Sequence, residues 1–394
     1  MKVKGFLKDV GGASRITKAR ISAIDNASPV PVKVDPIHEV AYALHPGRLK
    51  LVVTDIRPAN STCKTVRLQA ADGRRLPLFR AGQYIVLDFQ IGDSLVSRPY
   101  SISSAPLCTV GEDSFVEVTV RSGDGKLFVS DYVWNELKVG DHLSGIVGCG
   151  DFFYEPLRDA YHVVALAGGV GITPFASMAA EVAAGRLDID LTIIYGAQRH
   201  DDIILWKELA PLEGEHVHFV HVISGEDPHW QGERGFITAE LIKKYSHEDT
   251  TYFACGPQPM YLHLYKEFAK LDLPARRVRF EVFGPVKDIS QYEGYPQEAK
   301  GKTFALTVVR GIHEDVIPAR ADESLAVALE RAGIRIETGC RSGECGFCRS
   351  KVLSGHVYVS PVSDGRRAAD KDFGYVHACA AYPLSDVKLK VPIL

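Results

Sequence analysis

The first hydrophobic pattern in this 394-residue chain consists of short β-rich runs separated by turn residues. It extends over residues 49–157, with runs such as 84–87, 114–120 and 143–147. Dipeptides rich in Gly and Asp stand between these runs. Repeated short strands with turn signals are typical of an antiparallel barrel or sandwich. We expect an antiparallel β-barrel here.

A second pattern, over residues 158–284, alternates strand-like and helix-like segments. The strand-like runs are 162–167, 191–195, 217–223 and 251–255, and the helix-like runs are 173–184, 237–245 and 259–271. This alternation predicts a doubly wound α/β domain with a parallel sheet. The uncharged stretch 160–180 has the length of a membrane span. Glycines and Pro174 interrupt it midway, so we interpret it as a strand, a glycine turn and a helix.

The remaining segments complete a multidomain organisation. Residues 303–394 begin with two strand candidates and an amphipathic helix at 324–332. The polar, glycine-bearing stretch 285–302 is typical of a linker. Residues 1–48 show no strong period and form an N-terminal extension, which either wraps the barrel or docks a partner.

Composition narrows the function. The chain has 46 Lys and Arg against 49 Asp and Glu, and 46% of its residues are hydrophobic. This balance argues against a disordered chain and against a polybasic nucleic-acid binder. The N-terminus has no apolar run of signal-peptide length, so we expect a cytoplasmic protein without a membrane span. In a reducing compartment, clustered cysteines bind metal more often than they form disulfides.

Four of the eight cysteines form such a cluster. Cys340, Cys345 and Cys348 have the spacing C-x4-C-x2-C, and Cys379 follows after 30 further residues. This spacing is the plant-type [2Fe-2S] signature. An isolated Cys345-x2-Cys348 would also suit half of a zinc site or a redox dithiol. The neighbouring glycines, Cys340 and Cys379 disfavour that alternative and predict four iron ligands.

Two other motifs suit a flavin and a nicotinamide nucleotide. In Arg98-Pro99-Tyr100-Ser101, the arginine can hold a phosphate, the tyrosine can lie on a ring system and the serine can bond a ring nitrogen. Tyr100 could instead cap the barrel, and Arg98 could be solvated. The turn 168–174 follows an apolar strand and opens a helix, as a pyrophosphate site requires. It departs from the G-x-G-x-x-G fingerprint because Pro174 replaces the last glycine.

Together these motifs resemble the ferredoxin-NADP reductase superfamily, in its phthalate dioxygenase reductase-like branch. The resemblance rests on Arg98–Ser101, the turn 168–174, Cys255-Gly256-Pro257 and Glu281-Val282-Phe283-Gly284. Residues 337–348 are similar to a plant-type ferredoxin, which implies a β-grasp α+β fold. The resemblance covers residues 49–394 and implies a flavin barrel, a nicotinamide domain and a [2Fe-2S] domain.

The resemblance also implies residue roles. Arg98 would bind the flavin phosphate, Tyr100 would stack on the isoalloxazine and Ser101 would lie near N5. Phe283 would cover the flavin face, with Glu281 close by, although Phe283 could also be a core aromatic. The residues expected to hold the nicotinamide nucleotide are Gly168, Gly169, Gly171, Thr173, Cys255 and Gly256. Cys255 could equally be a small buried hydrophobe.

Two departures affect the choice of cofactor. The family's second flavin motif, G-x-x-S, has here four residues between Gly125 and Ser130, so FAD is favoured over FMN only on the overall resemblance. After the strand that ends at Ile223, residues 224–227 include two carboxylates that would repel a 2′-phosphate. NADH is therefore expected rather than NADPH. Arg199 and Arg234 are the cations that could reverse this preference.

These inferences define a hypothesis about activity. NADH reduces the flavin by hydride transfer, and the cluster passes single electrons to an electron-accepting redox protein, such as an oxygenase or hydroxylase component. The candidate catalytic residues are Ser101, Cys255, Glu281 and Phe283. The alternative is a noncatalytic electron-transfer subunit or redox sensor of a larger complex.

Overall fold

The computed structural model describes residues 6–28, 35–44, 47–284, 286 and 288–392. Parts of the expected extension (1–5, 29–34, 45 and 46), of the expected linker (285 and 287) and of the C-terminal domain (393 and 394) lie outside the described residues. The chain divides into two compact units, Met1–His45 and Pro46–Leu394. Each unit is considered by itself.

The first unit contains two helices that the sequence pattern does not predict. They are α1 (Phe6–Asp25) and α2 (Pro36–Leu44). In α1, the side chains of Ile16, Ile21 and Ile24 are all exposed. Gly11 and Gly12 inside α1 and the prolines before α2 disfavour a helical prediction from the sequence.

The second unit begins with a six-stranded antiparallel sheet in the order β4-β3-β6-β1-β2-β5. Its elements are β1 (Leu49–Pro58), β2 (Cys63–Ala70), β3 (Tyr84–Ile91), β4 (Ser94–Ser101), β5 (Val116–Arg121), β6 (His142–Cys149) and the helix α3 (Phe128–Asn135). A bridge between Ile102 and Val118 joins the two edges of the sheet into a barrel. Buried Asp88 of β3 accepts hydrogen bonds from Ser97 Oγ at 2.6 Å and Ser144 Oγ at 2.7 Å. This carboxylate ties β3 to both of its neighbours.

A parallel sheet follows, in the order β10-β9-β8-β7-β11-β12. Its strands are β7 (His162–Gly168), β8 (Asp190–Ala197), β9 (Val217–Ile223), β10 (Glu233–Arg234), β11 (Thr250–Cys255) and β12 (Val278–Glu281). The helices are α4 (Thr173–Ala183), α5 (Trp206–Leu209), α6 (Ala239–Lys244) and α7 (Gln258–Phe268). The strand order reverses between β7 and β11, and α/β proteins bind ligands at such a switch point.

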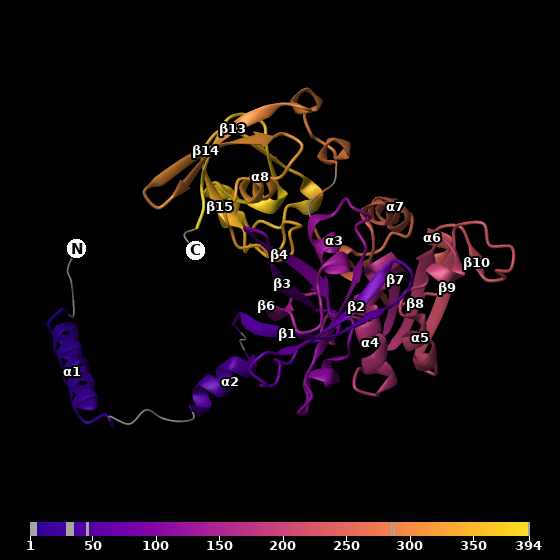
Figure 1. Ribbon diagram of the computed structural model, residues 1–394, viewed down its shortest axis with the longest axis horizontal. Coiled ribbons are helices and arrows are strands. Elements are labelled where there is room, and N and C mark those ends of the chain that lie inside the picture. Colours follow the sequence, from indigo (N-terminus) through magenta and orange to yellow (C-terminus); the bar gives the residue numbers. More distant parts are fainter. Residues whose placement is uncertain (1–5, 29–34, 45–46, 285, 287, 393–394) are drawn as a thin grey trace. The chain divides into compact units, whose positions relative to one another are not determined.

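Alternation along β7 places apolar side chains on both faces of this sheet. Val163 and Ala165 pack with Phe175 of α4, whereas Val164 and Leu166 pack with Leu264 of α7. The helices α4 and α5 lie on one side of the sheet, and α6 and α7 lie on the other (Figure 1). This burial on both faces explains why the strands are nearly continuous hydrophobic runs.

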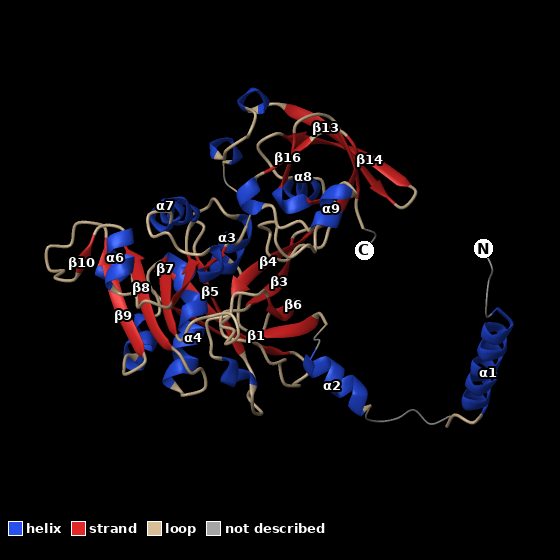
Figure 2. Ribbon diagram, turned by 180° about the vertical axis from the view of Figure 1, so that it is seen from behind, coloured by secondary structure: helices blue, strands red, loops and turns tan. Residues whose placement is uncertain are grey.

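The C-terminal part forms a mixed sheet in the order β14-β13-β19-β15-β17, with a separate β16-β18 pair. Its elements are β13 (Thr303–Arg310), β14 (His313–Arg320), α8 (Leu325–Arg331), β15 (Arg349–Ser354), β16 (Val357–Val359), α9 (Ala368–Asp372), β17 (Tyr375–His377), β18 (Ala381–Pro383) and β19 (Val387–Lys390). Only β13 and β19 pair in parallel within this sheet. Helix α8 lies beside the strands (Figure 2) and buries Leu325, Ala328 and Leu329. The predicted fold class, an antiparallel barrel, a doubly wound α/β domain and a β-grasp domain, is confirmed.

The segment between the last two domains packs against the C-terminal one. The Tyr295 hydroxyl donates a hydrogen bond to the Ala321 carbonyl at 3.2 Å, and its ring meets Tyr358 edge-on with centroids 5.4 Å apart. Short 3₁₀ turns occur at 106–109, 169–172, 200–202, 210–212, 275–277, 289–291, 297–299, 361–363 and 378–380. None of the helices in the described residues is long and apolar enough to cross a membrane.

Candidate redox site

The glycine turn lies at the switch point of the parallel sheet. Ala167 at the end of β7 pairs with Cys255 at the end of β11. A Cβ atom on Gly171 would lie 2.0 Å from the carbonyl oxygen of Cys255, so no larger residue fits. Thr173 opens α4, and no side chain caps this helix N-terminus. The Thr173 amide donates to the Val170 carbonyl of the preceding 3₁₀ turn, and the positive end of the helix dipole suits a pyrophosphate.

Tyr261 connects the ends of β11 and β12, although no sequence motif singled it out. Its hydroxyl accepts a hydrogen bond from the Gly256 amide at 2.9 Å and donates one to the Glu281 carbonyl. Cys255 is buried beside it, and this burial raises the pKa of the Cys255 thiol well above its usual range. Cys255 is therefore a neutral thiol. The only sequence signal for Tyr261 is its position four residues after Pro257, in helix α7.

Ser101 and Glu281 meet although they are 180 residues apart in the chain. The Ser101 hydroxyl donates a hydrogen bond to Glu281 Oε2 at 3.2 Å, and both side chains are buried. Burial raises the pKa of Glu281 well above its usual range, and the bond from Ser101 opposes this only in part. Burial therefore favours the neutral, proton-bearing form of the Glu281 carboxyl.

The end of the nicotinamide domain also contacts the barrel and the cysteine loop. Tyr84 of β3 meets Phe283 edge-on with ring centroids 5.1 Å apart. Tyr84, Val86 and Cys340 form one buried cluster against which Phe283 packs. The Gly284 amide donates a hydrogen bond to the Cys340 carbonyl at 3.2 Å. Three segments from the three domains therefore converge here.

Arg98 and Tyr100 extend from the same strand that carries Ser101. Arg98 Nη1 donates to the Ser97 carbonyl at 2.8 Å and lies 3.5 Å from Glu330 Oε1. Burial, followed by the nearby Arg341, lowers the pKa of Arg98. Tyr100 packs edge-on against Phe89, with ring centroids 6.2 Å apart. A guanidinium, a phenol ring and a serine hydroxyl on one strand form a donor set that fits a flavin phosphate and ring.

The second flavin candidates belong to α3 and its preceding loop. Gly125 has a φ of 75° and its amide donates to Asp131 Oδ1 at 3.1 Å. Ser130 is half-buried in the first turn of α3. Tyr132 of the same helix packs against Phe89, the ring that Tyr100 also contacts. The structure thus brings α3 close to the end of β4.

The cations that could favour NADPH differ in their surroundings. Arg234 Nη2 donates a hydrogen bond to the Asp227 carbonyl at 2.7 Å, so this guanidinium already has a backbone partner. Arg199 is exposed, and its Nε lies 3.9 Å from Asp202 Oδ2. Glu226 is exposed in the same loop region. The Asp202 carboxylate beside Arg199 and the exposed Glu226 would repel a 2′-phosphate, as expected for a site that accepts NADH.

The cysteine loop gathers four thiols and several amides. The sulfurs of Cys348 and Cys379 lie 3.2 Å apart. The Cys340 sulfur accepts hydrogen bonds from the amides of Ser342 at 3.4 Å and Cys345 at 3.3 Å. Contacts with the Cys345 and Cys379 thiols, together with the Cys345 amide, hold the pKa of Cys340 far below its usual range. The same contacts raise the pKa of the Cys345 and Cys379 thiols, so the loop stabilises negative charge at the Cys340 sulfur in particular.

Two observations test whether this loop fits an iron–sulfur cluster. The hydroxyl oxygens of Thr338 and Ser342 are buried and have no hydrogen-bond partner among the described residues. Gly343 has a φ of 95°, and a Cβ there would lie 2.3 Å from the Ser363 carbonyl oxygen. A loop curled this tightly with unpaired donors suits bridging sulfide, which accepts hydrogen bonds. The cysteine set and its surroundings therefore fit a [2Fe-2S] cluster.

Comparison with known proteins agrees with this geometry. Residues 165–265 match the oxidoreductase NAD-binding domain family, and residues 311–384 match the 2Fe-2S iron-sulfur cluster binding domain family. The chain is therefore an NAD(P)H-dependent oxidoreductase with a C-terminal 2Fe-2S domain, and it is similar to reductases of the ferredoxin-NADP reductase type, which supports FAD as its flavin.

Particular relatives are similar over most of their length. The carnitine monooxygenase reductase subunit of Escherichia coli is 27% identical over 306 residues, which cover 77% of this chain and 86% of that protein. The glycine betaine monooxygenase reductase subunit of Chromohalobacter salexigens is 28% identical over 338 residues, covering 81% and 89%. The structure of phthalate dioxygenase reductase has the same fold, with a TM-score of 0.62, 21% identity and coverage of 89% and 99%.

Proposed function

We propose that this chain is the reductase component of an oxygenase system and delivers electrons from NADH to a partner oxygenase protein. The observation that carries the proposal is the convergence of Ser101, Phe283 and Cys340 from three domains. The two relatives named above are reductase subunits of monooxygenases, which supports an oxygenase partner. A noncatalytic subunit would not need the buried Ser101–Glu281 pair.

The roles of the individual residues belong to the same proposal. Arg98 and Tyr100 hold the flavin phosphate and ring, with Gly125 and Ser130 contributing from α3 and its loop. Gly168, Gly169, Gly171, Thr173, Gly256 and Arg199 bind the nicotinamide nucleotide. Cys340, Cys345, Cys348 and Cys379 ligate iron. The proposed domains are an extension (1–48), a flavin barrel (49–157), a nicotinamide domain (158–284), a linker (285–302) and a ferredoxin domain (303–394). We place the protein in the cytoplasm, where thiols stay reduced.

When bound, the cofactors supply hydride acceptance and one-electron chemistry. The chain contributes position and protonation. Neutral Glu281 and the Ser101 hydroxyl hold a proton next to the site without placing a charge in it. Phe283 and Tyr84 form an apolar wall that excludes water between the end of the nicotinamide domain and Cys340. Arg98 offers a positive group for the flavin phosphate.

Replacing Cys345 with serine tests the order of electron transfer. The variant should lose the cluster, and its NADH-dependent reduction of cytochrome c should fall by about tenfold or more. Its reduction of a small dye that accepts electrons from flavin should be unchanged. Iron content, flavin content and both activities are measured on the purified protein.

Cys108→Ser provides the matched control because Cys108 is a partly buried cysteine outside the cluster. It should retain iron and both activities. Equal loss of dye and cytochrome reduction in Cys345→Ser, with flavin retained, would contradict the proposed path through the cluster.

A further inference from the structure

Three histidines and one aspartate gather at the amino ends of the parallel strands. His162 begins β7 and pairs with Asp190, which begins β8. His218 is the second residue of β9, and His247 lies in the loop before β11. These strands are neighbours in the order β9-β8-β7-β11. The nucleotide site lies at their carboxyl ends, which are about 20 Å away along β7 at ~3.3 Å per residue.

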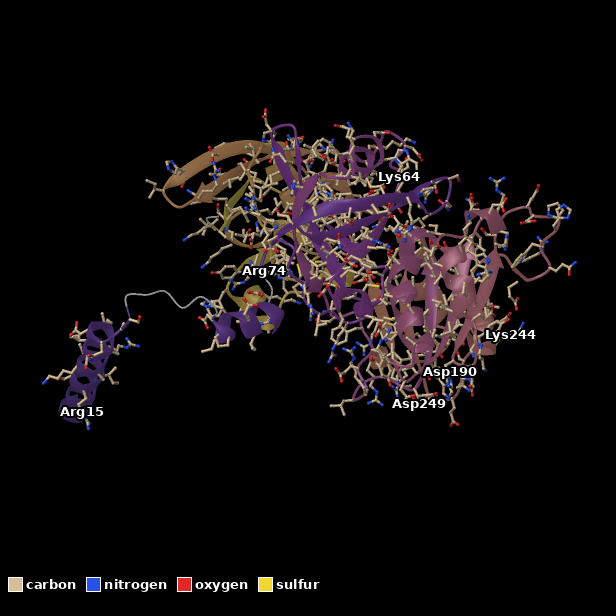
Figure 3. The ribbon with its side chains drawn as sticks, turned by 60° about the horizontal axis from the view of Figure 1, so that its bottom comes forward. Arg15, Lys64, Arg74, Asp190, Lys244 and Asp249 are labelled. Atoms are coloured by element: carbon tan, nitrogen blue, oxygen red, sulfur yellow. The ribbon has the colours of Figure 1, made fainter. Side chains whose placement is uncertain are left out.

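Strand alternation turns three of these side chains to the same face of the sheet. Val163, Leu191 and Val217 all pack into the core on the α4 side. Their sequence neighbours His162, Asp190 and His218 therefore face the α6 and α7 side. Figure 3 labels Asp190 together with Asp249, which lies two residues after His247, at the end of the domain where the parallel strands begin.

The distances within this cluster are those of metal ligands. His162 Nδ1 lies 3.0 Å from Asp190 Oδ2, and His218 Nε2 lies 3.4 Å from Asp190 Oδ1. Ligand atoms of His162, Asp190 and His247 all lie within 4.8 Å of one another. Two ligands of a tetrahedral zinc ion are about 3.3 Å apart, given bonds of ~2.0–2.1 Å. His162, Asp190 and His247 thus need only small side-chain rotations to close on one ion, whereas His218 contacts Asp190 alone.

The carboxylate has capacity left for such an ion. Asp190 Oδ1 is buried and makes no hydrogen bond among the described residues, and its contact with His218 Nε2 at 3.4 Å is an ion-pair distance only. The rings of His162 and His247 are stacked, with centroids 3.8 Å apart and planes 20° apart. His247 is exposed on its loop, so its ring can turn a nitrogen toward the shared space. Solvent exposure of His247 also leaves an entry path.

We propose that His162, Asp190 and His247 bind one divalent transition-metal ion, of which Zn²⁺ fits best, with solvent as the fourth ligand. Imidazole nitrogens select zinc, copper or nickel over magnesium and calcium, and a mixed His and Asp set suits tetrahedral zinc. The ion would cross-link β7, β8 and the loop before β11. The ion would lie at the amino ends of the strands, whereas the nucleotide site lies at their carboxyl ends. It would therefore stabilise the domain without taking part in electron transfer.

The test uses the full-length holoprotein with its flavin and cluster. After incubation with zinc chloride and gel filtration, metal analysis should find one zinc ion per chain. X-ray absorption at the zinc edge should show only nitrogen and oxygen neighbours at about 2.0–2.1 Å. Sulfur neighbours at about 2.3 Å would instead place the zinc on the cysteines and overturn the proposal.

Variants of the cluster separate a specific site from general histidine binding. His162→Ala/His247→Ala should lose the zinc, whereas His142→Ala/His356→Ala, which removes two exposed histidines in other domains, should keep it. Asp190→Asn preserves the side-chain size and should weaken zinc binding at least tenfold. Unchanged dye reduction and melting temperature in EDTA would show that the variants fold. Equal zinc content in all variants, or no retained zinc in the parent protein, would overturn the site.

Discussion

Glu281 shows how one buried side chain sets a pH dependence. Its pKa lies above the value of about 4.3 expected for the unfolded chain. Between these two values the folded protein binds a proton that the unfolded protein has released. The contribution of Glu281 to stability is therefore full below about pH 4.3 and is lost as the pH rises through the folded pKa.

Replacing Glu281 with glutamine should remove this loss of folding stability at higher pH. Glutamine remains neutral and its carbonyl oxygen can still accept the bond from Ser101. We expect the urea midpoint of the variant, relative to the parent, to increase between pH 5 and pH 8. Denaturation of both proteins across this range provides the measurement. Parallel midpoint profiles would show that burial does not hold Glu281 in its neutral form.

Phe283 offers a second test at the residue scale. Replacing it with alanine removes the ring that Tyr84 contacts and opens the space beside Cys340. We expect the KM for NADH to change by about tenfold, since an aromatic wall of the site is lost, while flavin content stays the same. Phe236→Ala is the control, because Phe236 is 71% exposed. A purified Phe283→Ala protein without flavin would assign this ring a structural role instead.

At the scale of elements, the close approach of the turn after β7 to β11 depends on Gly171. In Gly171→Ala, the new Cβ would meet the Cys255 carbonyl oxygen at 2.0 Å, and that oxygen belongs to the backbone. We expect a loss of about 3 kcal/mol of stability from overpacking, together with weaker NADH binding. Gly214→Ala should be nearly neutral, because nothing lies within 4 Å of its Cβ. Thermal melting and NADH titration compare the two, and equal behaviour would contradict this packing argument.

The same elements show what sequence can predict. The runs 162–167, 217–223 and 251–255 are predicted within a residue of β7, β9 and β11, because they consist mostly of apolar, aromatic and β-branched residues. Helices α1 and α2 are missed because Gly11 and Gly12 lie inside α1 and a proline-bearing segment precedes α2. Local patterns therefore predicted the buried elements well.

Sequence motifs predict which residues are candidates for the site, but they do not predict which of these residues contact one another. The cluster cysteines and Ser101 stand in recognisable spacings, whereas the bond from Ser101 to Glu281 depends on how two domains pack. Tyr261 has no motif because its two partners, Gly256 and Glu281, are brought together by the order β7-β11-β12. Such non-local contacts follow from the strand order, which residue spacing alone does not encode.

At the scale of the whole molecule, one carboxylate joins the flavin barrel to the iron–sulfur loop. Glu330 of α8 accepts hydrogen bonds from Arg341 Nη1 at 2.5 Å and Nη2 at 2.9 Å. The same Glu330 lies 3.5 Å from Arg98 of the barrel. Arg341 follows the proposed iron ligand Cys340 directly and its side chain is only 3% exposed. The proposed flavin-phosphate group and the cluster loop therefore share one counter-charge.

Replacing Glu330 with alanine should affect both stability and electron transfer between domains. The variant leaves Arg341 buried without its carboxylate, which costs about 3 kcal/mol by analogy with other broken buried pairs. It also removes the attraction that holds Arg98 near the cluster loop. We expect NADH to reduce the flavin at the parental rate in stopped-flow experiments, while the following reduction of the cluster slows.

Glu314→Ala is the control, since Glu314 pairs with Lys388 at an exposed site where an ion pair contributes about 0–1 kcal/mol. Unaltered cluster reduction in Glu330→Ala, with unfolding shifted as expected, would limit this carboxylate to a role in the stability of the ferredoxin domain.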